Sequence, residues 1–456
     1  MINRRLFLQS LAAAAGAATA SRKAAAARAG FGDLVADPAG ILDLPPGFSY
    51  RVISSKGERM DDGFLVPAGA DGMAAFAGED GTVVLVCNHE NLPGTPADGP
   101  WGPTLQGLGQ PGREYVYDAG GGSTPGNGGT TTIVYDPRSR RVLRRHLSLA
   151  GTELNCAGGP TPWGSWLSCE ECFRDEGTSF EGGQVVQRER RHGYVFEVPA
   201  SAGGPVTPVP LKAMGRFEHE ACAVHPRSGA VYLSEDRHHS LLYRFLPRVR
   251  GRLQEGGQLQ ALAIIGSPGF DTRNWDAPES VRPGEVFDVR WVDLDDVDGD
   301  ANDLRLRGRE RGAAIFARGE GLCMAEGSLV FACTIGGRDR LGQVFVYRPG
   351  PREGMPGETG RPGQLELLAE SRPDSLLRHA DNLTRSPWGD LIVCEDTADH
   401  CGLVGIRPDG LQYPLADNAY TTSELAGVCF SPDGGVMFVN IQLRGLTLAI
   451  TGPWPT

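Results

Sequence analysis

The sequence predicts an all-β fold, which we interpret as a six-bladed β-propeller with long loop insertions. The chain of 456 residues carries 64 glycines and 33 prolines, well above their usual share, and the glycines show no collagen-like period. Such a composition indicates many tight turns and disfavours a helical bundle. In addition, one phrase recurs six times: a glycine, a short apolar run of strand character, and then polar side chains.

Each copy of this phrase predicts a strand that follows a turn and is buried along its length. The copies span residues 81–90, 164–171, 229–236, 327–334, 389–396 and 435–440. Propeller blades of about 40–50 residues, lengthened by insertions, fit their irregular spacing. In three copies the first carboxylate comes six residues after the glycine, at Glu170, Glu235 and Glu395. We expect these strands to be the innermost strands of blades, so that their acids converge at one end of a channel. A pair of β-sandwiches with ordinary edge carboxylates is the alternative.

The first 29 residues predict a twin-arginine export signal. Arg4 and Arg5 are followed by Phe7-Leu8 and a mildly apolar run, and Ala27-Arg28-Ala29 offers a small-residue cleavage site. We expect residues 30–456 to form a single β-propeller catalytic domain. No later segment approaches 18 consecutive apolar residues, so no membrane span is expected in the mature form. The expected location is the periplasm or the outside of the cell, after contact with the twin-arginine export machinery.

The charge balance excludes a general attraction to nucleic acid or to anionic membranes. The chain has 44 lysines and arginines against 56 acids, which gives a net charge of −12. The motifs of several enzyme classes are also absent: there is no G-x-S-x-G, no phosphate-binding P-loop and no H-E-x-x-H. Cys169 and Cys172 form a lone C-x-x-C, which disfavours a structural zinc site because a second pair is missing.

Ten acids are candidate metal ligands because many of them end an apolar run. Carboxylates crowded at one end of a channel cannot all remain ionised unless cations neutralise them. Oxygen-rich clusters of this kind suit hard cations such as Ca²⁺, Mg²⁺, Mn²⁺ or ferric iron. The candidates are Glu90, Glu170, Glu171, Glu220, Glu235, Asp236, Glu320, Asp381, Glu395 and Asp396.

Several of these residues lie in longer phrases that resemble those of PhoX-type alkaline phosphatases. The longest and most specific phrase runs from Asn155-Cys156 through Gly164-Ser165-Trp166 to Glu170-Glu171. The shorter ones lie at 215–220, 234–237, 318–321, 381–383, 394–396, 423–427 and 430–434. The resemblance extends over nearly the whole mature chain, which is similar to a compact member of that family.

The resemblance implies a β-propeller that holds an Fe(III)–Ca²⁺ cluster with an oxo bridge. It implies that Cys156 is the thiolate ligand of iron, that Glu220 and Glu320 are metal-ligating catalytic glutamates, and that Arg318 holds the phosphate. The remaining carboxylates would come from Glu90, Glu170, Glu171, Glu235, Asp236, Asp381, Glu395 and Asp396. Export by the twin-arginine route is also typical of the family.

These observations favour an exported, metal-dependent hydrolase of phosphate monoesters that uses no serine nucleophile. Metal ions and an arginine can neutralise the phosphate oxygens and supply an activated nucleophile. The expected partner is a small phosphorylated substrate, and the expected state is a monomer. The alternative function is a propeller braced by calcium that acts as a binding module or hydrolyses diesters, phytate or lactone-like substrates. A thiolate at Cys156 separates the two, because a brace of hard cations does not need one.

Overall fold

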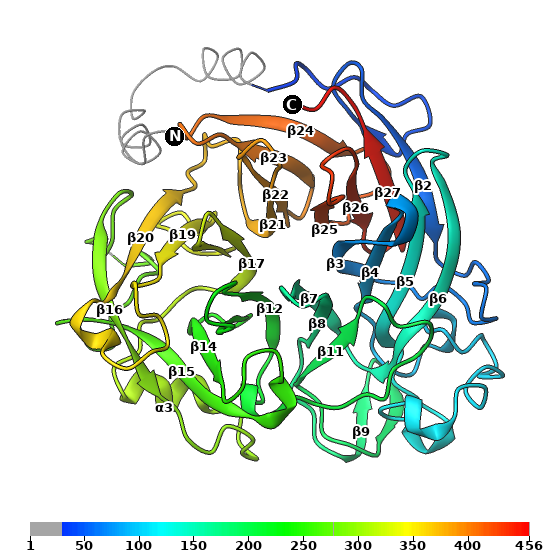
Figure 1. Cartoon of the computed structure of the whole chain (residues 1–456), viewed down its shortest axis with the longest axis horizontal. Coiled ribbons are helices and arrows are strands. Elements are labelled where there is room, and N and C mark those ends of the chain that lie inside the picture. Colours follow the sequence, from blue (N-terminus) through cyan, green and yellow to red (C-terminus); the bar gives the residue numbers. More distant parts are fainter. Residues whose placement is uncertain (1–29, 277, 456) are drawn as a thin grey trace.

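Six short strands surround the centre of the molecule (Figure 1). The computed structural model describes residues 30–276 and 278–455, so the predicted export signal at 1–29 lies outside the described residues. The six inner strands are β3 (Ala70–Ala77), β7 (Asn155–Pro160), β12 (His219–Val224), β17 (Gly319–Ala325), β21 (Ala380–Arg385) and β25 (Leu425–Phe430). Each contacts the next in chain order, and β25 contacts β3, so they form a closed ring.

Antiparallel strands extend outward from each inner strand. Three sheets have the orders β3-β4-β5-β6, β7-β8-β11 and β21-β22-β23-β24-β1. Their outer strands are β4 (Val83–His89), β5 (Gly128–Asp136), β6 (Arg141–Thr152), β8 (Ser165–Glu170), β11 (Val195–Pro199), β22 (Leu391–Glu395), β23 (Gly402–Ile406), β24 (Gln412–Asn418) and β1 (Leu42–Asp43). A separate hairpin is formed by β9 (Gly177–Glu181) and β10 (Gln184–Arg188).

One large sheet of nine strands joins two of these units. It starts at β12 and continues through β13 (Val231–Glu235), β14 (Tyr243–Pro247), β15 (Gly257–Ile264) and β16 (Val286–Asp293). It returns through β20 (Gly363–Glu370), β19 (Gln343–Arg348) and β18 (Ser328–Cys333) to β17. The predicted all-β, propeller-like architecture is thus confirmed. Six separate blades are not, because the pairing of β16 with β20 merges two units, and the blade count stays a prediction.

The two ends of the chain close the ring together. β2 (Ser49–Ser55), near the N-terminus, pairs with β27 (Leu446–Thr451), near the C-terminus, in the sheet β2-β27-β26-β25 that also contains β26 (Met437–Ile441). Beside it, Trp454 stacks on Trp388 with ring centroids 5.2 Å apart, and Phe31 and Phe48 meet the edges of these rings. Apolar burial and main-chain pairing therefore tie the termini to each other.

The remaining regular elements are short. Within the described residues the α-helix is α3 (Leu304–Glu310), and single turns of 3₁₀ helix occur at Glu79–Gly81, Pro96–Asp98, Arg113–Tyr115, Gly120–Gly122, Lys212–Met214, Leu253–Glu255 and Glu358–Gly360. None of the helices in this part of the chain has the length and apolar character needed to cross a membrane.

One sequence-based expectation about the strands was wrong. The six repeated apolar phrases form β4, β8, β13, β18, β22 and β26, which are the second strands of their units. They read as continuous apolar runs because sheets on both sides cover them; every residue of β8 and β13 is buried. Five of the six innermost strands instead have an acid or Cys156 as their second residue, which interrupts the apolar pattern; β25 is the exception, because it is apolar throughout.

Candidate metal centre

The start of the inner strands places five side chains with metal-binding chemistry at one end of the ring. In five of the strands the second residue is Asp71, Cys156, Glu220, Glu320 or Asp381. In each of these strands the pairing register shifts at that residue, which marks a β-bulge. Because bulges leave residues out of the ladder and redirect their side chains, they can turn these groups toward the axis.

A small residue follows four of these five side chains, and close packing explains it. A Cβ atom on Gly72 would lie 2.6 Å from the Cα of Ala157, and one on Gly321 would lie 2.7 Å from the carbonyl oxygen of Asp381. Real Cβ atoms do not approach so closely, so only glycine fits at these two positions. The backbones of neighbouring inner strands therefore come near enough for their acidic side chains to meet.

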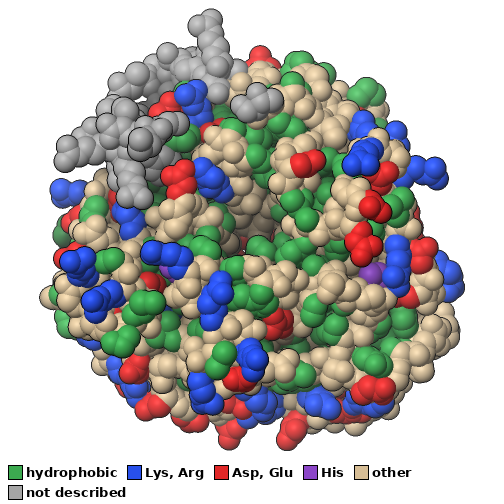
Figure 2. All heavy atoms as spheres, viewed as in Figure 1, with side chains coloured by type: hydrophobic (Ala, Val, Ile, Leu, Met, Phe, Trp, Pro, Cys, Tyr) green, Lys and Arg blue, Asp and Glu red, His purple; other side chains and the backbone are tan. Residues whose placement is uncertain are grey.

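A second tier of acids follows the strands just outside the ring. Glu90, Glu171, Asp236 and Asp396 come directly after β4, β8, β13 and β22, and Glu424 directly precedes β25. Their charges influence the ionisation of the inner acids and of one another. We call the combined set the acid–thiol cluster: Asp71, Glu90, Cys156, Glu171, Glu220, Asp236, Glu320, Asp381, Asp396 and Glu424. Figure 2 shows one face of the molecule, which is hollowed at its centre, where the ring of inner strands lies in Figure 1.

Three overlapping groups within the cluster have geometry suited to metal ions. They are Asp71 with Glu90 and Cys156, Cys156 with Glu171 and Glu220, and Glu220 with Glu320 and Asp381. In each group the candidate ligand atoms all lie within 4.8 Å of one another. Cys156 and Glu220 each belong to two groups, so each of them would be available to more than one ion.

The electrostatics of the cluster show a deficit of positive charge. Burial, together with neighbouring carboxylates, raises the pKa of Asp71, Glu171, Glu220, Glu320 and Glu424 well above the usual range. The pKa of Glu90 rises to about 7 and that of Asp381 to about 6, again mainly because of burial. Burial and the charge of Asp71 also raise the pKa of the Cys156 thiol. Bound cations would reverse these shifts, since they favour the ionised forms.

Arg318 is the only cation that forms an ion pair with any carboxylate of the cluster within the described residues. Its Nε and Nη2 donate to the two oxygens of Asp236 at 2.7 and 2.8 Å. Its Nη2 also lies 3.2 Å from Oε1 of Glu320, a buried oxygen that has no hydrogen-bond partner of its own. A single guanidinium cannot balance nine carboxylates, so the donor set fits a site for several cations.

A match to a family model covers residues 29–445, and its description is alkaline phosphatase PhoX. The chain belongs to the PhoX family of alkaline phosphatases. Its fold is similar to a solved structure of Pseudomonas fluorescens PhoX in complex with vanadate, a transition state analogue, with a TM-score of 0.64 and 18% identity over 91% of this chain and 96% of that one. At this identity the similarity is one of fold.

A second solved structure is less similar. A gluconolactonase from Xanthomonas campestris, XC5397, aligns over 93% of this chain and 98% of its own at 14% identity, with a TM-score of only 0.38. No curated protein matches the sequence. The family match therefore decides the assignment: the chain is a PhoX-type phosphatase, and a small phosphorylated compound is its substrate.

Nine of the residues predicted as site residues meet in the cluster of this PhoX protein or pair with it. These are Glu90, Cys156, Glu171, Glu220, Asp236, Arg318, Glu320, Asp381 and Asp396.

The structure does not bring Glu170, Glu235 and Glu395 to the cluster. Each of the three is the last residue of its strand and pairs across the ladder with the first residue of an inner strand. Because side chains alternate along a strand, they point away from the acids that follow them.

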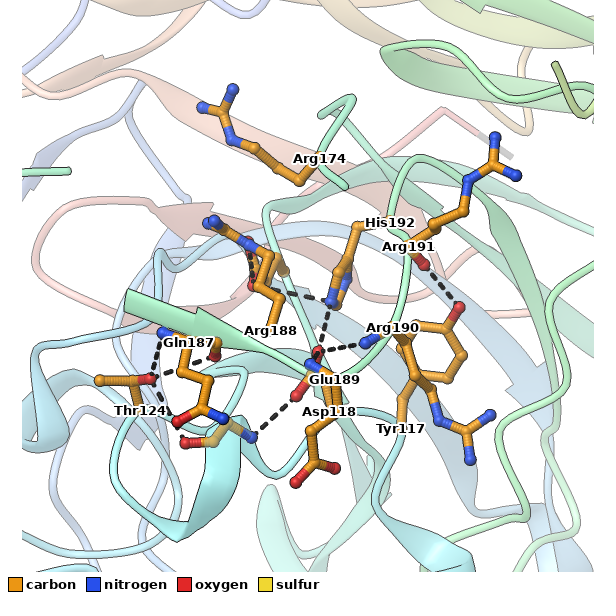
Figure 3. A network of polar contacts seen from close by, with 12 residues as sticks. Tyr117, Asp118, Thr124, Arg174, Gln187, Arg188, Glu189, Arg190, Arg191 and His192 are labelled. Carbon is orange, nitrogen blue, oxygen red and sulfur yellow. Dashed lines mark hydrogen bonds and ion pairs between the residues drawn. The ribbon is translucent and has the colours of Figure 1, made fainter. Parts of the chain in front are cut away.

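These three acids instead have partners within the sheets. Glu170 accepts hydrogen bonds from the backbone N–H groups of Glu153 and Gly193 and lies 2.7 Å from Nδ1 of His192. Glu235 accepts a hydrogen bond from the Tyr243 hydroxyl, and Glu395 accepts one from the backbone N–H of Arg378. Figure 3 shows His192 between its neighbours in this buried network, with Asp118 and Arg188 beside it.

Sequence reasoning missed three polar residues of the site: Asp71, Glu424 and Gln442. Nε2 of Gln442 donates to Asp71 and Glu90 at 2.7 Å each, so it holds two cluster acids side by side. Asp71 carried a usable signal, because Ala70-Asp71-Gly72 has the same small–acid–glycine form as Gly319-Glu320-Gly321. Gln442 carried none, because it lies in a polar turn after an apolar run.

A residue with left-handed backbone precedes four of the inner ligand residues. Gly69, Leu154, Arg318 and His379 each lie two residues before a ligand position, and all four have a left-handed φ, between 45° and 53°. For the three that are not glycine this conformation costs about 1–2 kcal/mol. Strain of this kind, repeated at equivalent positions, indicates that the entry to each strand is fixed by the site it builds.

Proposed function

We propose that the chain is an exported phosphatase that hydrolyses phosphate monoesters with an iron–calcium cluster and without a serine nucleophile. The observation that carries the proposal is the acid–thiol cluster, in which nine carboxylates and a thiol lie together and one arginine forms ion pairs with two of the carboxylates. In this proposal the six inner strands are those of six blades, and the cluster lies at the end of their channel. Membership of the PhoX family supports the reaction class.

The donor types support iron and calcium as the metals. A thiolate is a poor ligand for Ca²⁺ and a good one for iron, so we assign Cys156 to Fe(III), together with Glu220 and Glu320. The remaining carboxylates, Asp71, Glu90, Glu171, Asp236, Asp381, Asp396 and Glu424, are hard oxygen donors suited to Ca²⁺. When bound, such ions would neutralise the phosphate oxygens and lower the pKa of a bound water or activate a bridging oxygen.

Within the chain itself we assign the catalytic roles to Arg318, Glu220 and Glu320. The guanidinium of Arg318 has the fork geometry that matches two oxygens of a phosphoryl group. Glu220 and Glu320 lie in the group nearest to it, and Glu320 contacts it directly. Glu220 and Glu320 are buried and Arg318 is partly exposed, so little water surrounds the two acids, and their interactions with a charged substrate are strengthened.

The proposed location follows from the N-terminus. A twin-arginine signal at 1–29 would direct the folded, metal-loaded protein to the periplasm or beyond, and residues 30–456 would then act as one catalytic domain. Twin-arginine export carries folded proteins, which agrees with a cluster that is assembled before export. We propose a monomer that binds no nucleic acid and has no membrane span in its mature form.

Metal content and activity, measured on the same sample, test the proposal. Protein purified through its own export route without chelators is analysed by elemental mass spectrometry and assayed with p-nitrophenyl phosphate at alkaline pH. About two irons and several calciums per chain, with turnover, are expected. Calcium without iron would overturn the assignment of Cys156 and favour the calcium-braced binding module or a calcium-only hydrolase.

A further inference from the structure

A tryptophan with cationic neighbours lies at the end of the ring that carries the proposed active centre. Trp275 belongs to the long insertion 265–285 between β15 and β16, and its Nε1 donates to the carbonyl oxygen of Ile335 at 2.8 Å. The guanidinium carbons of Arg273 and Arg340 lie 4.2 and 4.4 Å from the centroid of its ring. The rings of His238 and His239 lie 6.0 and 6.2 Å away. We call these five residues the Trp275 platform.

Two loops attach the platform to residues that build the acid–thiol cluster. In the loop after β18, the backbone N–H of Thr334 donates to the carbonyl oxygen of Arg318 at 3.1 Å. In the same loop, the carbonyl oxygen of Leu341 accepts a hydrogen bond from the backbone N–H of His379. Arg318 and His379 each lie two residues before a cluster acid. In the loop after β13, the carbonyl oxygen of Arg237, the neighbour of His238, accepts a hydrogen bond from the backbone N–H of Arg318 at 2.9 Å. The platform is therefore at the same end of the ring as the cluster.

The platform carries uncompensated positive charge. Arg273 is paired with Asp271, and Asp339, the neighbour of Arg340, is paired with Arg372. Arg340 itself is exposed and forms no ion pair within the part of the chain that the structure describes; its guanidinium lies over the Trp275 ring. The surroundings of His239 agree with this, because burial and the charges of Arg273 and Arg309 lower its pKa.

We propose that the Trp275 platform is a leaving-group subsite, which binds a second anionic group, a carboxylate or phosphate, on the substrate of the phosphatase. The proposal rests on the proposed function. Trp275 fixes the stacked guanidinium of Arg340, which lowers the entropy that the side chain loses on binding. Arg340 then pairs with the second oxyanion while the phosphoryl group is held at Arg318. Substrates with an anionic leaving group are thereby preferred over neutral analogues.

The experiment compares matched substrates on the full-length, metal-loaded enzyme. Glycerol 3-phosphate and 3-phosphoglycerate differ by a carboxylate, and fructose 1,6-bisphosphate offers a second phosphate farther from the first. The quantity measured is the ratio of kcat/KM for each anionic substrate to kcat/KM for glycerol 3-phosphate. We expect the ratio to exceed one for at least one anionic substrate and to fall about tenfold in Arg340→Ala, because a charge-assisted hydrogen bond is lost.

Three further variants sharpen the test. Arg340→Glu should lower the ratio further, and Arg340→Lys should restore part of it because the charge is kept. Arg252→Ala is the control: this exposed arginine lies in the loop between β14 and β15, at the opposite end of the strands, and should leave the ratio unchanged. A ratio near one in the wild type, or one that Arg340→Ala does not change, overturns the subsite alone. Failure to hydrolyse glycerol 3-phosphate and both anionic substrates overturns the proposed function and the subsite together.

Discussion

The guanidinium of Arg318 forms a bidentate ion pair with the carboxylate of Asp236, with Nε–Oδ1 at 2.7 Å and Nη2–Oδ2 at 2.8 Å. Asp236 follows β13, whereas Arg318 precedes β17, so this pair joins two units of the ring. Burial alone would lower the pKa of the guanidinium, but its bond to Asp236 and the charge of Glu320 raise it. Arg318 therefore stays charged at every pH at which the enzyme could work.

Arg318→Lys should lower kcat/KM for a phosphate monoester by about 10–100-fold. Lysine keeps the charge but offers a single point contact, so it cannot reproduce the two parallel hydrogen bonds of a guanidinium to phosphate. Steady-state kinetics with p-nitrophenyl phosphate measure the effect, and metal analysis of the same sample serves as the control. An unchanged kcat/KM at normal metal content would show that Arg318 only braces the ring.

Cys156→Ala should abolish iron binding and turnover together while the fold survives. Sγ of Cys156 lies 3.2 Å from Oε1 of Glu220 and 3.8 Å from Oδ1 of Asp71, so its loss removes a ligand shared by two of the three candidate groups. Elemental analysis, activity and circular dichroism test the three parts of this prediction. Cys323→Ala is the matched control, because this half-buried thiol lies on an inner strand but outside the cluster. Full activity in Cys156→Ala would contradict the assignment.

The sequence was sufficient to predict the class of fold and most of the cluster, but not the direction of each side chain. In the pair Glu170–Glu171 both residues end an apolar run, and only the register of β8 decides which one faces the axis. That register depends on the bulge in β7 and on pairing across the ladder, which a single strand does not encode. The same ambiguity applied to Glu235–Asp236 and Glu395–Asp396.

The inner strands were missed for a different reason. The close approach of their backbones requires small residues, as at Gly72 and Gly321, and their function requires acids. In these strands, unlike the apolar β25, neither the apolar run nor the alternation of a strand is left. Propensity would assign such segments to loops. The small–acid–glycine form that Ala70-Asp71-Gly72 shares with Gly319-Glu320-Gly321 is the signal that could have been used, and it would have identified Asp71.

Metal removal should make stability depend strongly on pH. Without cations, Glu90 has a pKa of about 7 and Asp381 of about 6 in the folded protein, against 4.5 and 3.8 in the unfolded chain. Acids with raised folded pKa values stabilise the protein fully below the unfolded values, and this stability is lost as pH rises to about 7. Glu90 alone would account for a loss on the order of 3 kcal/mol.

Urea denaturation at pH 5, 6, 7 and 8, with and without prior chelation, measures this dependence. The free energy of unfolding of the chelated protein should fall steadily over the series, whereas the metal-loaded protein should change little because cations hold the acids ionised. Parallel curves for the two forms would argue against metal binding by these carboxylates.

His192→Gln should destabilise the protein by about 3–5 kcal/mol near neutral pH, because it leaves buried acids without their charged partner. Nδ1 of His192 lies 2.7 Å from Glu170 and Nε2 lies 3.2 Å from Asp118. Burial would lower the pKa of the imidazole, but the charges of Glu170 and Glu153 raise it to about 10. The stability that this raised pKa contributes is fully present below pH 6.5 and is lost as pH rises through 10.

The difference in unfolding free energy between wild type and His192→Gln should therefore shrink between pH 7 and 10. Glutamine can still donate one hydrogen bond, so the comparison isolates the charge of the ring. A difference that stays constant over this range would show that His192 is neutral in the folded protein and acts through packing alone.

Trp454→Ala should weaken the closure of the ring without altering the metal centre. Trp454 stacks on Trp388 and meets the edges of Phe31 and Phe48, so its loss removes contacts that join the two ends of the chain. Because the side chain is only half-buried, we expect a cost of about 2 kcal/mol, below the range for a fully buried tryptophan. Thermal unfolding measures the cost, and limited proteolysis should cut first near β2 and β27, where the chain ends pair. Metal content and kcat, measured well below the unfolding transition, should match the wild type, because the cluster contacts neither Trp454 nor Trp388. A variant that loses its metal as readily as it unfolds would show instead that ring closure and metal binding are cooperative.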